Sequence, residues 1–205
     1  PAVIYRSVGH TNVEIPDRGI VNYEKALPLE KALHPDTLLA WAQNGEYMLH
    51  IHGAPVRLIV PGWSANWWVK WLDQLEIMDH VPSLFYQHDY FIFADSPTDP
   101  NKHSITAMGV RCVISEPLDE DSPLLRGAHM VRGRAWSGMG SIKRVEVSFD
   151  DGATWADAHI EEPREKWLWS RWSFLWEVTV PGAYRILARA TDECGRVQPQ
   201  IPWNY

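Results

Sequence analysis

The second half of the chain consists of short runs in which apolar and polar residues alternate. Val145, Val147 and Phe149 alternate with polar residues, and a similar alternation extends over residues 184–190. A period of two puts every second side chain on the same face of a strand, as in a half-buried antiparallel sheet. Strand-like runs with turns between them predict an all-β sandwich of the immunoglobulin type. The runs are 110–115, 128–136, 142–149, 167–178 and 184–190.

The first half of the chain mixes helical and extended signals. Residues 23–33 carry charged and apolar side chains at roughly helical spacing, although Pro28 limits the length of any helix there. Asn44–Gly45 is a strong turn signal between two extended pieces. Residues 58–60 predict a short buried strand. A junction near residues 101–106 separates this mixed half from the all-β half.

Three cationic or protonatable side chains surround the short strand at 58–60. His52 precedes it, Arg57 enters it, and Lys70 follows in the segment 68–71. A guanidinium group binds phosphate oxygens in pairs, an ammonium group adds a point charge, and an imidazole offers a ring N–H. The pattern therefore favours an anionic cofactor, such as a phosphate attached to a heterocycle, held against a rigid scaffold.

Composition restricts the classes of function. The formal net charge of −7 argues against a protein that binds the nucleic-acid backbone, since such proteins present a basic excess. No uninterrupted apolar run is long enough to span a bilayer. Cys112 and Cys194 lie far apart and lack the C-x-x-C spacing of zinc sites, so we expect both to be structural or incidental.

Tryptophan is abundant, with 12 residues in the chain. One cluster comprises Trp167, Trp169, Trp172 and Trp176. Such side chains bury a large apolar area and need one partner for the indole N–H, and they are also enriched at interfaces. The cluster therefore predicts either core packing or a dimer contact.

Several motifs resemble, in order and spacing, those of the sulfite oxidase family of molybdopterin-binding oxidoreductases. They are the segments 38–46, 52–62, 69–72, 89–90, 135–138 and 148–155. The resemblance implies an α+β chain with two domains. Residues 1–104 would be the C-terminal part of a mixed α/β molybdopterin-binding domain, and residues 105–205 an immunoglobulin-like dimerisation domain.

The same resemblance assigns roles to individual residues. The family's pterin contacts fall on five residues: His52, Arg57, Trp68, Val69 and Lys70. The family often has histidine where this chain has Trp68, so we expect Trp68 to contact the cofactor through its backbone or its indole N–H. The family's active-site tyrosine falls on Tyr90, whose phenol would donate a hydrogen bond at the metal or to the substrate. No residue of this chain is expected to bind the metal itself.

The implied reaction is the oxidation of sulfite to sulfate by oxygen-atom transfer at molybdenum, with electrons passed to a cytochrome-type acceptor. Tyr90 favours sulfite over nitrate, because related nitrate-reducing enzymes tend not to keep a tyrosine at this place. Other sulfur oxyanions and carrier-bound sulfur stay open as substrates. The implied partners are a second copy of the chain and a cytochrome c, and the resemblance favours the periplasm over the cytoplasm.

The resemblance also implies that the molybdenum-ligating cysteine lies upstream of Pro1. An arginine of the family's sulfite pocket would follow Tyr205. We therefore expect the chain to be the C-terminal half of a longer enzyme, or one piece of a cleaved one, with the upstream half as a further partner.

Other interpretations stay open. Residues 148–155 match the Asp-box turn of sialidases and other β-propellers, which would indicate a glycosidase, although a propeller repeats the motif by blade and this chain has it once. His50 and His52 alternate and could bind a metal, but no third ligand follows at ligand spacing. Finally, the chain could be a non-catalytic dimerisation or interaction fragment that lacks the metal-ligating cysteine.

Overall fold

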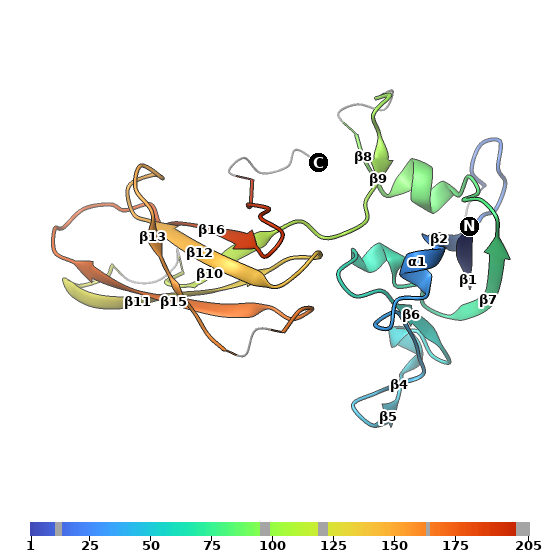
Figure 1. Ribbon diagram of the computed structural model, residues 1–205, viewed down its shortest axis with the longest axis horizontal. Helices are drawn as coiled ribbons and strands as arrows, with labels where there is room; N and C mark the ends of the chain where they lie inside the picture. Colours follow the sequence, from blue (N-terminus) through green and yellow to red (C-terminus); the bar gives the residue numbers. More distant parts are fainter. Residues whose placement is uncertain (11–13, 95–98, 119–122, 163–164, 200–205) are drawn as a thin grey trace. The chain divides into compact units, whose positions relative to one another are not determined.

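Both halves of the protein are dominated by β-strands (Figure 1). The structure is a computed structural model that describes residues 1–10, 14–94, 99–118, 123–162 and 165–199. Contacts divide the chain into two compact units, residues 1–106 and 107–205. Helical structure in the described residues consists of a four-residue α-helix and three short 3-10 or π-helical segments. The α+β class expected above is therefore not supported, and the protein is mostly β.

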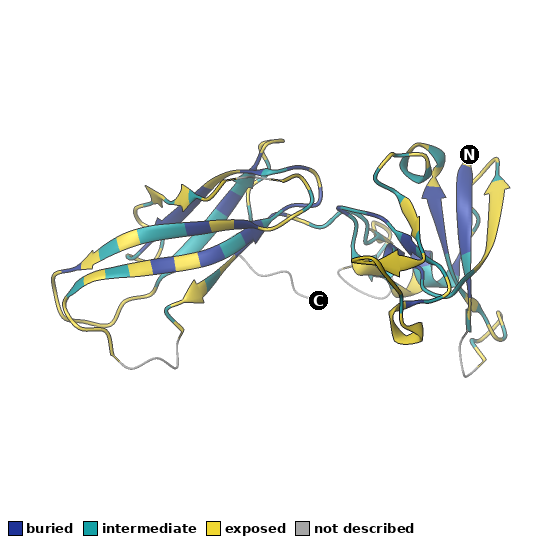
Figure 2. Ribbon diagram, turned by 90° about the horizontal axis from the view of Figure 1, so that it is seen from below, coloured by how far each residue is buried: buried dark blue, intermediate teal, exposed yellow. Residues whose placement is uncertain are grey.

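The first unit is built on a three-stranded antiparallel sheet in the order β2-β1-β7. Its strands are β1 (Ala2–His10), β2 (Asn22–Pro28) and β7 (Leu72–Met78). Strand β1 is buried on both faces, because Val3 and Tyr5 belong to one apolar cluster whereas Ala2 and Ile4 belong to another (Figure 2). This central strand fixes the position of the two strands beside it.

The helix expected within residues 23–33 is mostly a strand. Residues 22–28 pair with β1, and only α1 (Leu29–Ala32) is helical. Pairing with a buried neighbour overrides a weak helical pattern, since local propensity amounts to tenths of a kcal/mol per residue. Pro28 precedes the helix, where its missing N–H costs no helical hydrogen bond.

Short elements connect the sheet to the site region. β3 (Leu38–Ala40) pairs with β6 (Arg57–Ile59), which confirms the predicted strand at 58–60 to within one residue. The Asn44–Gly45 turn is also confirmed, with both residues at positive φ between paired strands. The other short elements are β4 (Ala42–Gln43), β5 (Glu46–Tyr47), η1 (His50–His52), η2 (Ala65–Trp67), η3 (Tyr86–Tyr90), β8 (Ile92–Phe93) and β9 (His103–Ser104).

The second unit contains two antiparallel sheets. One has the order β10-β11-β15-β14 and the other β13-β12-β16. Their strands are β10 (Arg111–Glu116), β11 (Gly127–Trp136), β12 (Ile142–Ser148), β13 (Ala156–Asp157), β14 (His159–Ile160), β15 (Ser170–Val178) and β16 (Leu187–Asp192). The predicted runs match β10, β11 and β12 closely, whereas β15 and β16 each begin three residues later than predicted. The immunoglobulin-like type of this unit stays a prediction.

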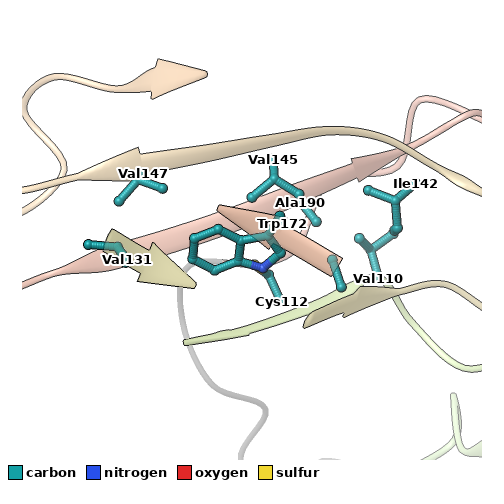
Figure 3. Close-up of a cluster of buried hydrophobic side chains, with 9 residues drawn as sticks. Val110, Cys112, Val131, Ile142, Val145, Val147, Trp172 and Ala190 are labelled. Carbon is teal, nitrogen blue, oxygen red and sulfur yellow. The ribbon is translucent and has the colours of Figure 1, made fainter. Parts of the chain in front are cut away.

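One apolar core joins the two sheets. Trp172 of β15 is fully buried and lies among valines of both sheets, with Val145 and Val147 on β12 and Val131 on β11 (Figure 3). Trp172 therefore serves core packing and is unavailable for a dimer contact. The buried Cys112 lies in the same core.

The described residues contain no helix with the length and apolar character needed to cross a membrane.

A lysine is fully buried in the first unit. Lys25 on β2 has no exposed surface, and its Nζ donates a hydrogen bond of 2.7 Å to the carbonyl oxygen of Tyr86. It also lies 4.9 Å from the ring centre of Trp67 and 4.8 Å from that of Phe91. Burial disfavours the charged form and lowers the pKa of Lys25 from 10.5 to about 7.

The buried lysine makes stability depend on pH. From about pH 7 to about pH 10 the unfolded chain holds a proton on Lys25 that the folded chain has lost, so stability rises with pH in this window. The free energy of unfolding of the wild type should therefore increase relative to that of Lys25→Met. Chemical denaturation across this range measures the difference, with the exposed Lys143→Met as the control. Parallel curves for wild type and Lys25→Met would contradict the assignment.

Candidate functional site

Two segments of the first unit meet at a cationic corner, defined here as His52, Arg57 and Lys70. Arg57 donates from Nη1 to the carbonyl oxygen of His52 at 2.9 Å and from Nη2 to that of Trp68 at 3.4 Å. Lys70 Nζ donates to the carbonyl oxygen of Ile51 at 3.0 Å. These bonds bring the three residues predicted from the sequence into one place. Because the acceptors are backbone carbonyls, the two cations are held without being neutralised.

Gly53 allows the corner to close. Its φ is 111°, in the region that favours glycine, and a Cβ atom there would lie 2.9 Å from Lys70 Cγ and 3.1 Å from Arg57 Cβ. Any larger residue would push the two cationic side chains apart. The sequence signal for this was the glycine directly after His52.

Trp71 carries backbone strain beside the corner. Its φ is 51°, which is unusual for a bulky residue, and such conformations cost about 1–3 kcal/mol and cluster at functional sites. Two hydrogen bonds hold Trp71 in this conformation. Its backbone N–H donates to the carbonyl oxygen of Gly53 at 3.2 Å, and its indole N–H donates to the carbonyl oxygen of His50 at 2.8 Å. Lys70 Nζ lies 4.4 Å above its ring.

The corner has an unsatisfied donor. Arg57 Nε is buried and has no hydrogen-bond partner among the described residues. Burial also lowers the pKa of Arg57 from its ordinary value. A buried donor left unpaired costs about 1–3 kcal/mol, so an acceptor beyond the described residues would stabilise the site. A phosphate group fits this donor set, because its oxygens accept from a guanidinium and from an ammonium group together.

Trp68 and Val69 make their hydrogen bonds and packing contacts within the first unit. The indole N–H of Trp68 already donates to the carbonyls of Val60 at 2.8 Å and Trp63 at 3.2 Å, and its backbone N–H donates to Ala65. Both N–H groups of Trp68 are thus occupied within the chain, and a contact between Trp68 and the cofactor stays a prediction. Val69 is fully buried, with its carbonyl bonded to Leu58. Trp68 and Val69 therefore fix the backbone that leads to Lys70, and the carbonyl of Trp68 accepts the hydrogen bond from Arg57.

Tyr90 stands at the end of a π-helical turn, here called the tyrosine turn (Tyr86–Tyr90). Single π turns are rare and occur frequently at functional sites. The Tyr90 side chain is 61% exposed, and its hydroxyl makes no hydrogen bond to a described residue. Its ring contacts Phe85, Tyr86 and Phe91, with ring centres 4.9–5.9 Å apart. The phenol is thus oriented by aromatic neighbours while its O–H stays available.

The tyrosine turn is anchored to the sheet on several sides. Gln87 is buried, its side-chain oxygen accepts from the backbone N–H of Ala26 at 2.9 Å, and its carbonyl accepts from Ser104 Oγ at 2.6 Å. Asp89 pairs with Arg18 at 2.7 Å and with Lys102 at 3.5 Å. The turn is therefore a fixed part of the first unit.

Within the described residues, no hydrogen bond or ring contact joins Tyr90 directly to the cationic corner. The two are linked through Lys25, which bonds the tyrosine turn and lies over Trp67, the residue before Trp68. Sequence reasoning missed Lys25. The available signal was the period-two series Tyr23, Lys25 and Leu27, which places the lysine on the buried face of its strand.

The described residues offer no metal-ligating cluster of three or more histidine, cysteine or acidic side chains. The hypothesis of a metal bound by His50 and His52 therefore gains no support. Burial raises the pKa of Cys112 to about 12, so this thiol stays protonated in the core. Cys194 is free and exposed.

The Asp-box segment forms a tight turn between β12 and β13. Asp150 accepts from Ser148 Oγ at 2.7 Å and from the backbone N–H and hydroxyl of Thr154, and these bonds lower its pKa to about 2. A glycosidase needs a carboxylic acid whose pKa is raised so that it can donate a proton. The glycosidase alternative is therefore not favoured.

Comparison with known proteins decides the family. Residues 3–86 match the oxidoreductase molybdopterin binding domain, and residues 102–205 match the Mo-co oxidoreductase dimerisation domain. The chain belongs to the sulfite oxidase family of molybdopterin oxidoreductases. The cationic corner lies inside the matched molybdopterin-binding range, whereas Tyr90 lies just beyond it.

Individual relatives include both sulfite- and nitrate-converting enzymes. The chain is 34% identical to human mitochondrial sulfite oxidase, over 89% of this chain and 36% of that protein. It is 31% identical to an inducible NADH nitrate reductase of Glycine max, over 93% of this chain and 25% of that protein. The sulfane dehydrogenase SoxCD of Paracoccus pantotrophus is similar in structure, with a TM-score of 0.79, 30% identity, and 97% of this chain and 48% of that chain covered. The chain thus spans a quarter to a half of these relatives.

Replacing Arg57 tests the cationic corner. Arg57→Ala removes the unsatisfied donor and both carbonyl bonds, so the holoenzyme should retain molybdopterin about tenfold less well or worse. Molybdenum and pterin content after gel filtration measures retention, with Arg132→Ala, a surface ion pair of the second unit, as the control. Unchanged cofactor content in Arg57→Ala would remove Arg57 from the binding site.

Proposed function

We propose that the protein takes part in the molybdopterin-dependent oxidation of sulfite to sulfate. The carrying observation is a free, exposed phenol on an anchored π turn, in the same unit as a cationic corner with an unpaired buried donor. The reaction takes up water and releases sulfate, two protons and two electrons. A cytochrome-type acceptor would receive the electrons. Export to the periplasm belongs to the same proposal and rests on the family resemblance.

His52, Arg57 and Lys70 would hold the phosphate end of the cofactor. Arg57 offers Nε and its remaining Nη protons, and Lys70 offers the ammonium protons that do not bond Ile51. The exposed ring of His52 offers one more N–H. When bound, the molybdenum cofactor supplies the oxygen-atom and electron transfer chemistry.

Tyr90 would act on the substrate. Sulfite is a small oxyanion, and a phenol O–H aimed at one of its oxygens stabilises the negative charge there more strongly as the charge develops. The ring contacts with Phe85, Tyr86 and Phe91 limit the directions in which the hydroxyl can point. Tyr90 would therefore orient the substrate and donate a hydrogen bond to it during turnover.

Tyr90→Phe should keep the ring contacts and lose the donor. Sulfite turnover (kcat/KM) should fall about a hundredfold, whereas molybdenum content should stay at the wild-type level. Tyr47→Phe, at an exposed tyrosine in the same unit, is the control and should match the wild type. Sulfite-dependent reduction of cytochrome c measures turnover. A variant with full turnover would exclude Tyr90 from the mechanism.

Two other substrates are compared: sulfane sulfur in the same assay, and nitrate in an assay that follows oxidation of a reduced electron donor, because nitrate takes up electrons. Sulfane sulfur bound to a carrier is favoured by the structural likeness to a sulfane dehydrogenase, which covers 97% of this chain. Nitrate is favoured by the nitrate reductase relatives. A wild-type enzyme that turns over one of these and leaves sulfite unchanged would overturn the sulfite proposal.

The second unit would form a homodimer. Its range matches a dimerisation domain, and the outer face of the β10-β11-β15-β14 sheet exposes apolar side chains, with Met130 paired to Leu175 and Val113 nearby on β10. Trp169 is 67% exposed, and its ring centre lies 6.1 Å from that of Trp136. Of the tryptophan cluster, Trp169 therefore stays a candidate for contact with the second copy of the chain. Aromatic and apolar groups of this kind are enriched at interface cores.

Sedimentation tests the dimer. At micromolar concentration the chain of 23.6 kDa should sediment as a species of twice its mass, and Leu175→Asp should shift it toward the monomer, because a carboxylate on the interface would be desolvated. The control is Leu33→Asp, an exposed leucine in the first unit. Monomers alone at this concentration would contradict the proposed homodimer.

A further inference from the structure

Lys25 closes the turn that carries Tyr90. The carbonyl oxygen of Tyr86, which accepts the bond from Lys25 Nζ at 2.7 Å, also accepts from the backbone N–H of Phe91 at 3.4 Å. That second bond spans five residues and is the one that makes the turn π-helical around Tyr90. The two donors share one acceptor. The Lys25 side chain, which is an ammonium group below about pH 7, thereby joins the Tyr86 carbonyl at the start of the turn to β2.

The same ammonium group contacts the segment that leads to the cationic corner. It lies 4.9 Å from the ring centre of Trp67, and the indole N–H of Trp67 donates to the carbonyl of Ile105 at 2.5 Å. Trp67 is 1% exposed and is followed by Trp68, whose carbonyl holds Arg57. One buried side chain therefore touches both the tyrosine turn and the support of the cofactor contacts.

Nothing described around Lys25 neutralises its charge. The groups that face it include the rings of Tyr23, Trp67 and Phe91 and the carbonyl of Tyr86. Tyr5, the partner of Lys25 on β1, lies in the same apolar cluster, and burial raises the pKa of this phenol, so it also stays neutral. The Tyr23 hydroxyl donates to the carbonyl of Asn66, and burial raises the pKa of Tyr23, so this phenol stays neutral. Asp89 on the tyrosine turn pairs with Arg18 and Lys102 instead. The aromatic faces supply the remaining stabilisation through cation–π contact.

Keeping an unpaired lysine in a core costs stability, and methionine fills a similar volume without that cost. The cost is explained if the lysine supports activity, because functional sites are where buried ionisable groups are retained against stability. We infer that Lys25 is a positioning residue for Tyr90: it holds the Tyr86 carbonyl against the Trp67 ring and so fixes the tyrosine turn relative to the cationic corner. The inference rests on the proposed function in assigning Tyr90 to the substrate.

Amide hydrogen exchange tests the hydrogen bond between Lys25 and the tyrosine turn without any substrate. In the holoenzyme at pH 6, where Lys25 with its pKa of about 7 is mostly charged, Lys25→Met should speed exchange across residues 86–91 by about tenfold, since a charge-assisted hydrogen bond to the turn is lost. Lys31→Met is the matched control, because Lys31 Nζ also donates to a carbonyl, that of Pro61 at 3.0 Å, and lies 5.8 Å from the ring centre of Trp63. Lys25→Gln keeps a donor without the charge and replaces Lys25→Met where that variant fails to fold. Unchanged exchange at 86–91 would overturn the inference.

A double-mutant cycle separates positioning from general destabilisation. With Tyr90 present, Lys25→Met should lower kcat for sulfite about tenfold, with molybdenum content unchanged. In the Tyr90→Phe background the same substitution should have no effect, because the group that Lys25 positions has lost its donor. An equal loss in both backgrounds would show a merely structural role and overturn the inference. If the wild type does not oxidise sulfite, the proposed function fails, and the exchange result alone decides whether Lys25 holds the turn.

Discussion

The site depends on how Arg57 is held. Its guanidinium group donates to backbone carbonyls of two segments, at His52 and Trp68, and so joins the end of η1 to the segment after η2. A cation bound to neutral carbonyls keeps its charge for a ligand, whereas one paired with a carboxylate would not. The buried Nε without a described partner follows from this arrangement and gives the corner a donor that suits an anionic ligand.

The packed residues around the cationic corner hold Arg57 and Lys70 in position. Arg57 begins β6, and Leu58 and Val60, which follow it, are fully buried in the same cluster as Trp67 and Val69. Rigid packing holds the donors in place before the ligand arrives, which reduces the entropy lost on binding. The sheet around β1 extends this support to the tyrosine turn through Ala26 and Lys25. The proposed cofactor contacts and the proposed substrate contact are thus supported by the same sheet.

The sequence predicted the parts of the structure that local patterns determine. The alternation along 142–148 was sufficient to predict the strand β12, and the dipeptide Asn44–Gly45 was sufficient to predict the turn between β4 and β5. Both signals depend on neighbouring residues alone. The strand at 22–28 was missed, since its pairing with the distant β1 decides its conformation. The cationic corner was predicted because its members lie close together in the chain.

Other features of the site depend on contacts that no local pattern reveals. The indole N–H of Trp68 is occupied by Val60 and Trp63, which only the folded chain brings within reach. The period-two series of β2 indicates the buried face on which Lys25 lies, whereas the contacts of Lys25 with Trp67 of η2 and with Phe91 after η3 form only in the folded chain. Charged side chains are usually exposed, so a sequence-based assignment places such a lysine at the surface.

The central claim is that the cationic corner holds the molybdenum cofactor. The most direct measurement is the ratio of molybdenum to protein, by elemental analysis, in wild-type material purified from its native host under non-denaturing conditions. The account predicts a ratio near one per chain, because each chain carries one corner with one unsatisfied donor. A ratio near zero would contradict it.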